Sequence, residues 1–117
     1  MSTVFFTNMD TTPQMGLLNK LDTLMKKARL EEVVEENRLI AVKLHFGEYG
    51  NLAYIRPNFL KVIADRIKEL GGVPFLTDAN TLYKGSRSNA VDHLKTASLN
   101  GFRSEEHTSE LQSRQSI

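Results

Sequence analysis

The sequence predicts an α/β fold, a three-layer fragment with the element order β-α-β-α-β-α and a mostly parallel sheet. Short runs of β-branched and aromatic residues alternate with longer segments of helical apolar spacing. This alternation is typical of parallel strands joined by helical crossovers. The length of 117 residues suits one small domain.

The N-terminal part is predicted to hold a strand followed by a helix. Residues 3–6, Thr-Val-Phe-Phe, have a composition typical of strands. Thr11, Thr12 and Pro13 indicate a helix start, because hydroxyl side chains cap helices and proline suits their first turn. Residues 30–36 are expected to extend this helix, with their glutamates in solvent. One apolar face is then formed by Leu17, Leu18, Leu21, Leu24, Met25 and Ala28.

Two further strands and two further helices are predicted downstream. The apolar run at residues 39–46 favours a central strand covered on both faces, the most buried of the sheet. Pro57 opens a helix that Gly71 and Gly72 end, since glycine adopts the left-handed conformation of a C-cap. Residues 73–77 form the third strand and residues 78–88 a polar loop. Residues 89–100 form the last helix, which Gly101 caps.

Composition and charge exclude several classes of protein. The formal net charge is +1, so no overall field attracts nucleic acid or a membrane. Cysteine is absent, which excludes disulfides and thiolate metal ligands within this chain. The N-terminus lacks the basic and apolar regions of a signal peptide, and no apolar stretch is long enough to span a bilayer. The expected location is the cytoplasm, with no nucleic-acid or membrane partner.

The composition changes near residue 102. All nine aromatic residues lie in residues 1–102, whereas residues 103–117 are rich in Ser, Glu and Gln. One interpretation is a disordered tail. A sharper one is that residues 103–113, Arg-Ser-Glu-Glu-His-Thr-Ser-Glu-Leu-Gln-Ser, are the translation of a widely used sequencing adapter. We therefore expect a truncated N-terminal α/β domain at residues 1–102 and a non-native, disordered tail at residues 103–117.

The candidate site lies in the two loops that follow the second and third predicted strands. Ligands of open parallel sheets bind outside the carboxyl ends of the strands. Both loops are longer than connection requires and are rich in groups that bind anions, donate protons or ligate metals. The candidate ligand-binding residues are His45, Glu48, Asp78, Asn80, Lys84, Ser86 and Arg87.

Each candidate also has a structural interpretation. Lys84 and Arg87 near a helix start suit an anion, but the segment matches no complete phosphate-binding loop and can equally be a capped helix with solvated bases. His45, with Glu48 nearby, can act as acid, base or metal ligand, or simply end a strand. Asp78 can orient a ligand or coordinate a cation, or it can form an Asx turn towards Asn80 or pair with Arg87. His93 is expected on the surface.

Three segments carry a resemblance to a known family. They are residues 42–51, Val-Lys-Leu-His-Phe-Gly-Glu-Tyr-Gly-Asn, residues 54–57, and residues 77–94, Thr-Asp-Ala-Asn-Thr-Leu-Tyr-Lys-Gly-Ser-Arg-Ser-Asn-Ala-Val-Asp-His-Leu. Residues 42–102 resemble the N-terminal part of a bacterial and archaeal family of iron–sulfur-centre proteins, the domain of unknown function 362. The resemblance implies a longer α/β parent whose cysteine-rich, ferredoxin-like segment carries [4Fe–4S] clusters.

The resemblance implies an iron–sulfur redox or electron-transfer protein of unsettled reaction, of which this chain is the N-terminal part. The chain itself holds no cysteine, so no cluster ligand and no metal site is predicted within it. An alternative is an α/β domain that binds a small anionic ligand without a cluster. A purely structural module that docks onto a partner is the third hypothesis. The expected partners are a small anionic ligand or a redox protein.

Overall fold

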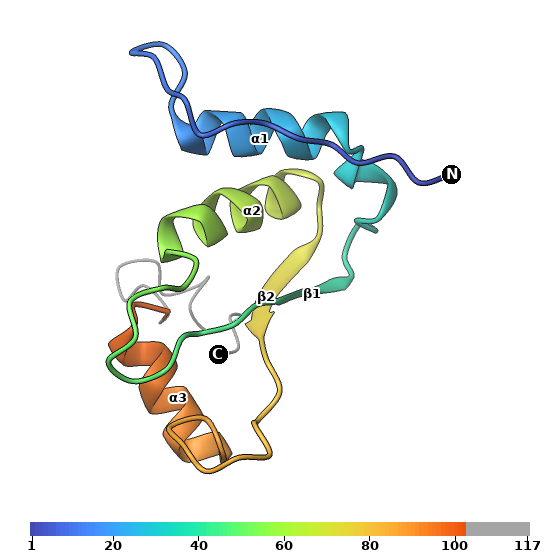
Figure 1. Ribbon diagram of the computed structural model, residues 1–117. Coiled ribbons are helices and arrows are strands. Elements are labelled where there is room, and N and C mark those ends of the chain that lie inside the picture. The colour runs from blue at the N-terminus through green and yellow to red at the C-terminus, as the bar shows by residue number, and fades with distance from the viewer. Residues whose placement is uncertain (103–117) are drawn as a thin grey trace.

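The computed structural model describes residues 1–102, which combine helices with a small parallel sheet (Figure 1). The elements follow one another as α1 (Leu17–Lys27), η1 (Leu30–Glu32), β1 (Leu39–Lys43), α2 (Pro57–Glu69), β2 (Val73–Thr77) and α3 (Ala90–Leu99). No helix in this part of the chain has the length and apolar character needed to cross a membrane.

The sheet confirms the parallel β-α-β unit at the centre of the predicted fold. β1 pairs with β2 in parallel, in a register that runs from Leu39 opposite Val73 to Lys43 opposite Thr77. α2 connects the two strands and packs against β2, while α1 packs against α2. Mixed helices and strands with a parallel sheet fit the α/β class.

The predicted strand at residues 3–6 is wrong. This segment is extended but unpaired, and the sheet within residues 1–102 contains β1 and β2 alone. The segment runs along α1 instead (Figure 1), and the side chains of Val4 and Phe6 stay 85% and 83% exposed. Strand composition favours pairing but does not supply the neighbouring edge that a strand requires. The described part therefore shows no third strand.

The boundaries of the first helix also differ from the prediction. Thr12 and Met15 form a tight turn, in which each backbone N–H donates to the other residue's carbonyl over 3.1 Å. The helix begins only at Leu17, after Gly16. Arg29 then adopts a left-handed conformation, with φ of 62°. That conformation interrupts helical hydrogen bonding, so the expected extension is reduced to the short turn η1.

β1 is not the most buried strand, contrary to the prediction. Leu39, Ala41 and Lys43 are exposed, whereas no residue of β2 is. Alternate residues of a strand face opposite sides of the sheet, and α2 covers only the side to which Ile40 and Val42 belong. The apolar run predicted that helices would cover both faces of this strand, but the elements within residues 1–102 cover only the face of Ile40 and Val42.

α2 confirms both of its predicted boundaries. Pro57 occupies the first turn, where its missing N–H costs nothing. After the helix, Gly71 has a φ of 89°, in the left-handed region that favours glycine. Gly72 follows at a point of close packing, because a Cβ built on it would lie 2.8 Å from Val34 Cγ1 and 2.9 Å from Ile67 Cγ2.

Replacing Gly72 by alanine should destabilise the fold by about 1–3 kcal/mol, the usual cost of overpacking a core. The added methyl group has no space between the side chains that it meets. Urea unfolding of the two proteins measures the difference. Gly16→Ala is the matched control, because a Cβ there has no neighbour within 4 Å. Equal midpoints for the Gly72 variant and the parent would show that this packing gives way easily.

The core lies beyond the carboxyl ends of the strands, where α3 packs on the chain that leaves β1. Phe46 and Phe102 are 3% and 2% exposed, and their rings meet edge to face with centroids 5.2 Å apart. Tyr54 packs against the same cluster, with its centroid 5.9 Å from that of Phe102. The remaining buried members of this cluster are Leu44, Leu60 and Ala97. The core therefore fixes the two loops in which the candidate site lies.

Candidate functional site

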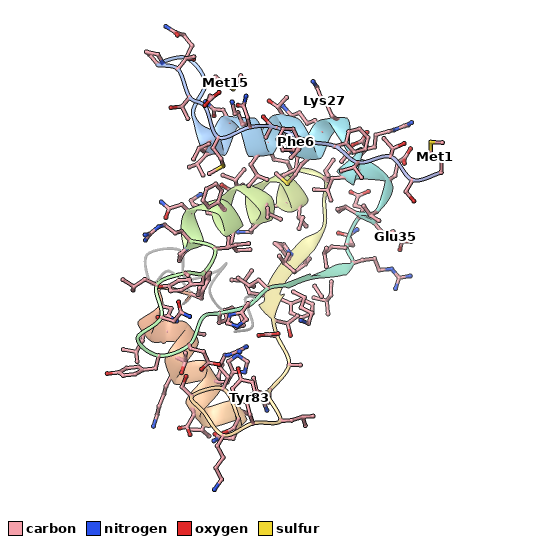
Figure 2. All side chains as sticks on the ribbon, viewed as in Figure 1. Met1, Phe6, Met15, Lys27, Glu35 and Tyr83 are labelled. Carbon is pink, nitrogen blue, oxygen red and sulfur yellow. The ribbon has the colours of Figure 1, made fainter. Side chains whose placement is uncertain are left out.

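The site is built by the loop after β1, residues 44–56, the loop after β2, residues 78–89, and the first half of α3. Tyr83 marks the second loop in Figure 2. Both loops leave the same edge of the sheet because β1 and β2 are parallel. Of the candidate residues, the structure brings together Glu48, Asp78, Ser86 and Arg87 at this edge.

Glu48 joins the two loops. Its Oε1 atom accepts hydrogen bonds from the Tyr83 hydroxyl over 2.7 Å and from Arg87 Nε over 2.8 Å. Its Oε2 atom accepts from the Ser86 hydroxyl over 2.9 Å. Arg87 Nη2 in turn donates to the Tyr83 hydroxyl over 2.8 Å, which closes a ring of three side chains. One carboxylate thus holds three groups of the second loop.

Arg87 lies between two carboxylates. Its side chain is 7% exposed, and Nη1 donates to Asp78 Oδ2 over 3.3 Å as Nε does to Glu48. Asp78 is equally buried, and its Oδ1 atom also accepts from the backbone N–H of Ala79 over 2.8 Å and pairs with Lys43 over 3.2 Å. Two cations and two anions therefore balance one another. The guanidinium already has partners in this arrangement, as the structural interpretation of Arg87 and Asp78 expected.

The network shifts the pKa of its members. Hydrogen bonds from Tyr83, then Arg87 and Ser86, lower the pKa of Glu48 to about 2. Burial opposes ionisation of Asp78, but the Ala79 N–H and Lys43 outweigh it, so the pKa of Asp78 is also lowered. Burial likewise works against the charge of Arg87, and its hydrogen bonds to Glu48 and Tyr83 leave the pKa raised. All three groups are therefore ionised at neutral pH.

Acid should destabilise the fold in a range set by Glu48. The folded-state pKa of about 2 lies below the unfolded value of 4.5, so the unfolded chain takes up the proton first as the pH falls. The stabilisation is complete above pH 4.5 and is lost as the pH falls towards 2. Unfolding midpoints across this range should fall less steeply in Glu48→Gln. Glu31 is exposed, so Glu31→Gln should show the same fall of the unfolding midpoint with pH as the parent. If Glu48→Gln also falls as steeply as the parent, Glu48 does not cause the acid sensitivity.

His93 is buried, so its predicted surface position is wrong. It is 6% exposed and packs edge to face on Phe46, with ring centroids 5.7 Å apart. Nδ1 lies 2.9 Å from Asn80 Oδ1, while Nε2 lies 3.7 Å from Asp78 Oδ2 and has no hydrogen-bond partner within residues 1–102. Burial lowers the pKa of His93. The ring is therefore neutral at physiological pH.

A cavity of about 250 Å³ lies beside this histidine, between the end of β2 and α3. Its polar side is formed by Thr77, Asp78, Asn80 and His93. Its apolar side is formed by Phe46, Leu76, Ala90, Leu94 and Ala97. The position outside the carboxyl end of a parallel strand is the one that ligands of α/β proteins use.

The other candidate residues lie at the margin of the network. His45 is exposed, and its Nδ1 atom accepts a hydrogen bond from the Gly47 backbone over 2.9 Å. Lys84 is exposed and joins none of the ion pairs formed within residues 1–102. The start of α3 is capped by Asn89, whose side chain accepts from the Asp92 N–H over 2.9 Å. Within residues 1–102, no three potential ligands cluster to hold a metal.

Two residues of the site were not predicted from the sequence. Tyr83 stands four residues before Arg87 in the same polar loop. A hydroxyl that close in sequence to a guanidinium could have indicated the hydrogen bond between them. His93 follows Ala90 by three residues and precedes Ala97 by four, which places it on one helix face with them. The buried residues of α3 are His93, Thr96 and Ala97, whereas Val91, Leu94 and Leu99 are exposed. The large apolar residues of this helix therefore do not mark its buried face.

Comparison with known proteins gives one match. No curated protein and no solved structure is significantly similar to the chain. A family model described as domain of unknown function (DUF362) matches residues 40–112, which is more than half of the sequence. The match begins within β1, includes both loops of the site and α3, and runs into residues 103–112, where the expected adapter segment lies outside the described residues. The chain therefore belongs to the DUF362 family.

Proposed function

We propose that this chain is the N-terminal, cluster-free part of an iron–sulfur redox protein. Its membership of the DUF362 family carries the proposal, together with the resemblance of its motifs to iron–sulfur-centre proteins. A [4Fe–4S] cluster in such proteins supplies one-electron redox chemistry and needs thiolate ligands. The chain has no cysteine. Its own residues therefore do not fit a cluster, and the ligands would come from sequence beyond it.

In this proposal the chain supplies a rigid loop platform at the carboxyl end of the sheet. Glu48 bonds to Tyr83, Ser86 and Arg87 and so ties the first loop to the second. Arg87 then fixes the second loop to the end of β2 through Asp78. The proposed location of the protein is the cytoplasm, and its proposed partner is a redox protein.

The test begins with the uninterrupted reading frame from the source organism's reads. We expect it to encode cysteines at ferredoxin spacing after this segment. The complete protein, purified without oxygen, should contain iron and sulfide and give the electron paramagnetic resonance signal of a reduced [4Fe–4S] cluster. Replacing those cysteines by serine should abolish the signal. A complete frame without such cysteines, or a complete protein free of iron after reconstitution, would overturn the proposal.

A second candidate function is the binding of a small anionic ligand without a cluster. The observation that favours it is the exposed base Lys84 in the loop before α3, the group that would attract an anion, while the cavity of about 250 Å³ beside Asp78, Asn80 and His93 offers space but no positive charge. Inorganic phosphate can serve as a probe in calorimetry. Binding that Lys84→Ala weakens, and that Lys95→Ala on α3 leaves unchanged, would support this candidate. Equal binding by both variants, or none by the parent, would remove it.

We also propose that residues 103–117 derive from a sequencing adapter, since the eleven residues from 103 to 113 reproduce its translation. Raw reads at this locus decide the origin. Reads that end in adapter sequence after codon 102 are expected. Independent reads that continue through codons 103–117 into genomic sequence would show that the segment is native.

A further inference from the structure

The cavity between the end of β2 and α3 has an unpartnered polar atom in its wall. His93 is 6% exposed, and its Nε2 atom forms no hydrogen bond within residues 1–102. Nε2 lies 3.7 Å from Asp78 Oδ2, which is beyond hydrogen-bond distance. Both residues line the cavity of about 250 Å³. Buried polar groups are nearly always hydrogen-bonded, so an unpartnered one beside a cavity points to a ligand.

The other ring nitrogen of His93 determines which kind of group Nε2 requires. Nδ1 lies 2.9 Å from Asn80 Oδ1. An amide oxygen only accepts hydrogen bonds, so Nδ1 carries the single proton of the neutral ring. Nε2 is then an acceptor, and it faces the Asp78 carboxylate, which is an acceptor as well. A ligand that satisfies both atoms must therefore bring hydrogen-bond donors.

The charges around the cavity favour a donor group that is itself uncharged. Asp78 already pairs with Lys43 over 3.2 Å and with Arg87 over 3.3 Å. Arg87 also pairs with Glu48 over 2.8 Å, so two cations balance two anions. An added ammonium group would meet the positive charges of Lys43 and Arg87 at close range. An anion would meet two acceptors in place of donors, and a neutral donor group avoids both penalties.

A primary carboxamide on an apolar body matches both sides of the cavity. A nitrogen about 2.9 Å from each acceptor closes a triangle on His93 Nε2 and Asp78 Oδ2, and a carboxamide nitrogen has one N–H for each. Asn80, which also lines the cavity, carries an amide donor for the carboxamide oxygen. An engineered cavity of about 150 Å³ holds benzene, so about 250 Å³ has room for one ring and this head. The ring would lie against the apolar side formed by Phe46, Leu76, Ala90, Leu94 and Ala97.

We propose that this cavity binds a small uncharged ligand with an apolar body and a primary carboxamide head, whose N–H groups donate to His93 Nε2 and Asp78 Oδ2. Every residue that lines the cavity lies within residues 46–97, inside the segment that the family model matches. The ligand differs in charge from the anion considered for Lys84. The inference does not rest on the proposed redox function, since it uses no group beyond these residues.

Three probes of nearly the same shape test the proposal on the 117-residue chain. Benzamide has both N–H donors, acetophenone has a methyl group in place of the amide nitrogen, and benzoate has a charged oxygen there. Nuclear magnetic resonance titrations measure the three dissociation constants. Benzamide should bind about tenfold more tightly than acetophenone, because acetophenone leaves the buried acceptors unpaired, and benzoate should bind most weakly. The largest shifts should fall on His93 and Asn80, and imidazole spectra should place the His93 proton on Nδ1.

Two variants and one control connect this binding to the cavity. His93→Phe keeps an aromatic ring against Phe46 but removes Nε2, so benzamide should lose its advantage over acetophenone. Ala90→Leu narrows the cavity that Ala90 lines and should weaken both probes by about tenfold. Val91→Leu is the matched control, because Val91 is 62% exposed and does not line the cavity, and it should leave both dissociation constants unchanged.

Four results would each overturn the proposal. Equal binding of benzamide and acetophenone by the parent would mean that water alone satisfies the two acceptors. Tightest binding of benzoate would assign the cavity to an anion. A proton on His93 Nε2 would make that atom a donor towards Asp78 and remove the need for a ligand donor. No binding of benzamide would show that the cavity is closed or filled in the 117-residue chain.

Discussion

Replacing Arg87 by leucine should lower the free energy of unfolding by about 3–5 kcal/mol, the usual cost of removing one partner of a buried ion pair. The side chain is 7% exposed and pairs with Glu48 and Asp78. Without it, the Asp78 carboxylate, which is also 7% exposed, retains only Lys43 as a cationic partner. Urea denaturation followed by circular dichroism measures the loss.

Two companion variants sharpen this test. Lys84→Leu changes an exposed base in the same loop and should alter stability by no more than about 0.5 kcal/mol. Combining Arg87→Leu with Glu48→Gln and Asp78→Asn removes the unpaired charges and should recover part of the loss, because uncompensated carboxylates cause most of it. If the Arg87 and Lys84 variants unfold at the same urea concentration, the ion pairs do not stabilise the fold.

Truncating Phe102 to alanine should cost about 3–5 kcal/mol, as measured for large-to-small substitutions in packed cores. The ring is 2% exposed and packs edge to face on Phe46. Its removal leaves a cavity between α3 and the chain after β1, which are the elements that frame the candidate site. Thermal and urea unfolding should both report the loss.

Phe6→Ala is the matched control for this variant, because the ring of Phe6 is 83% exposed. It should change stability little, since an exposed side chain gives up little burial on truncation. Phe102→Leu should lie between the alanine variant and the parent, as it refills part of the cavity. Equal stability of the two alanine variants would mean that Phe102 is not packed in solution as the structure shows.

Local signals predicted the elements whose boundaries depend on single residues. Pro57 and Gly71 bracket α2 as expected, and Asn89 and Gly101 bracket α3. Each acts through its own backbone or a nearby hydrogen bond, so no distant part of the chain is needed. The prediction of a strand at residues 3–6 was wrong because a β-strand forms only where a neighbouring strand pairs with it. That partner lies outside any local window of sequence.

The candidate site could be located from the sequence but not assembled from it. Topology places both loops at one sheet edge, which correctly brought Glu48 and Arg87 together. Whether Arg87 is open to a ligand or already paired depends on side-chain geometry, which spacing does not encode. His93 was expected on the surface, but the buried face of α3 holds His93 with Thr96 and Ala97, whereas the larger apolar residues Val91 and Leu94 are exposed.

The loop after β1 forms hydrogen bonds near both ends of α3, which restricts where residues can be inserted into the sequence. Near the start of α3, Glu48 holds Ser86 and Arg87. At its end, Asn100 donates to the Phe46 carbonyl over 2.8 Å. Extra residues between Phe46 and Glu48, or between Arg87 and Asn100, would change the spacing of these contacts and displace the helix from the core. The part of the same loop around Leu52, which is 79% exposed, lies outside these contacts and has room for insertions.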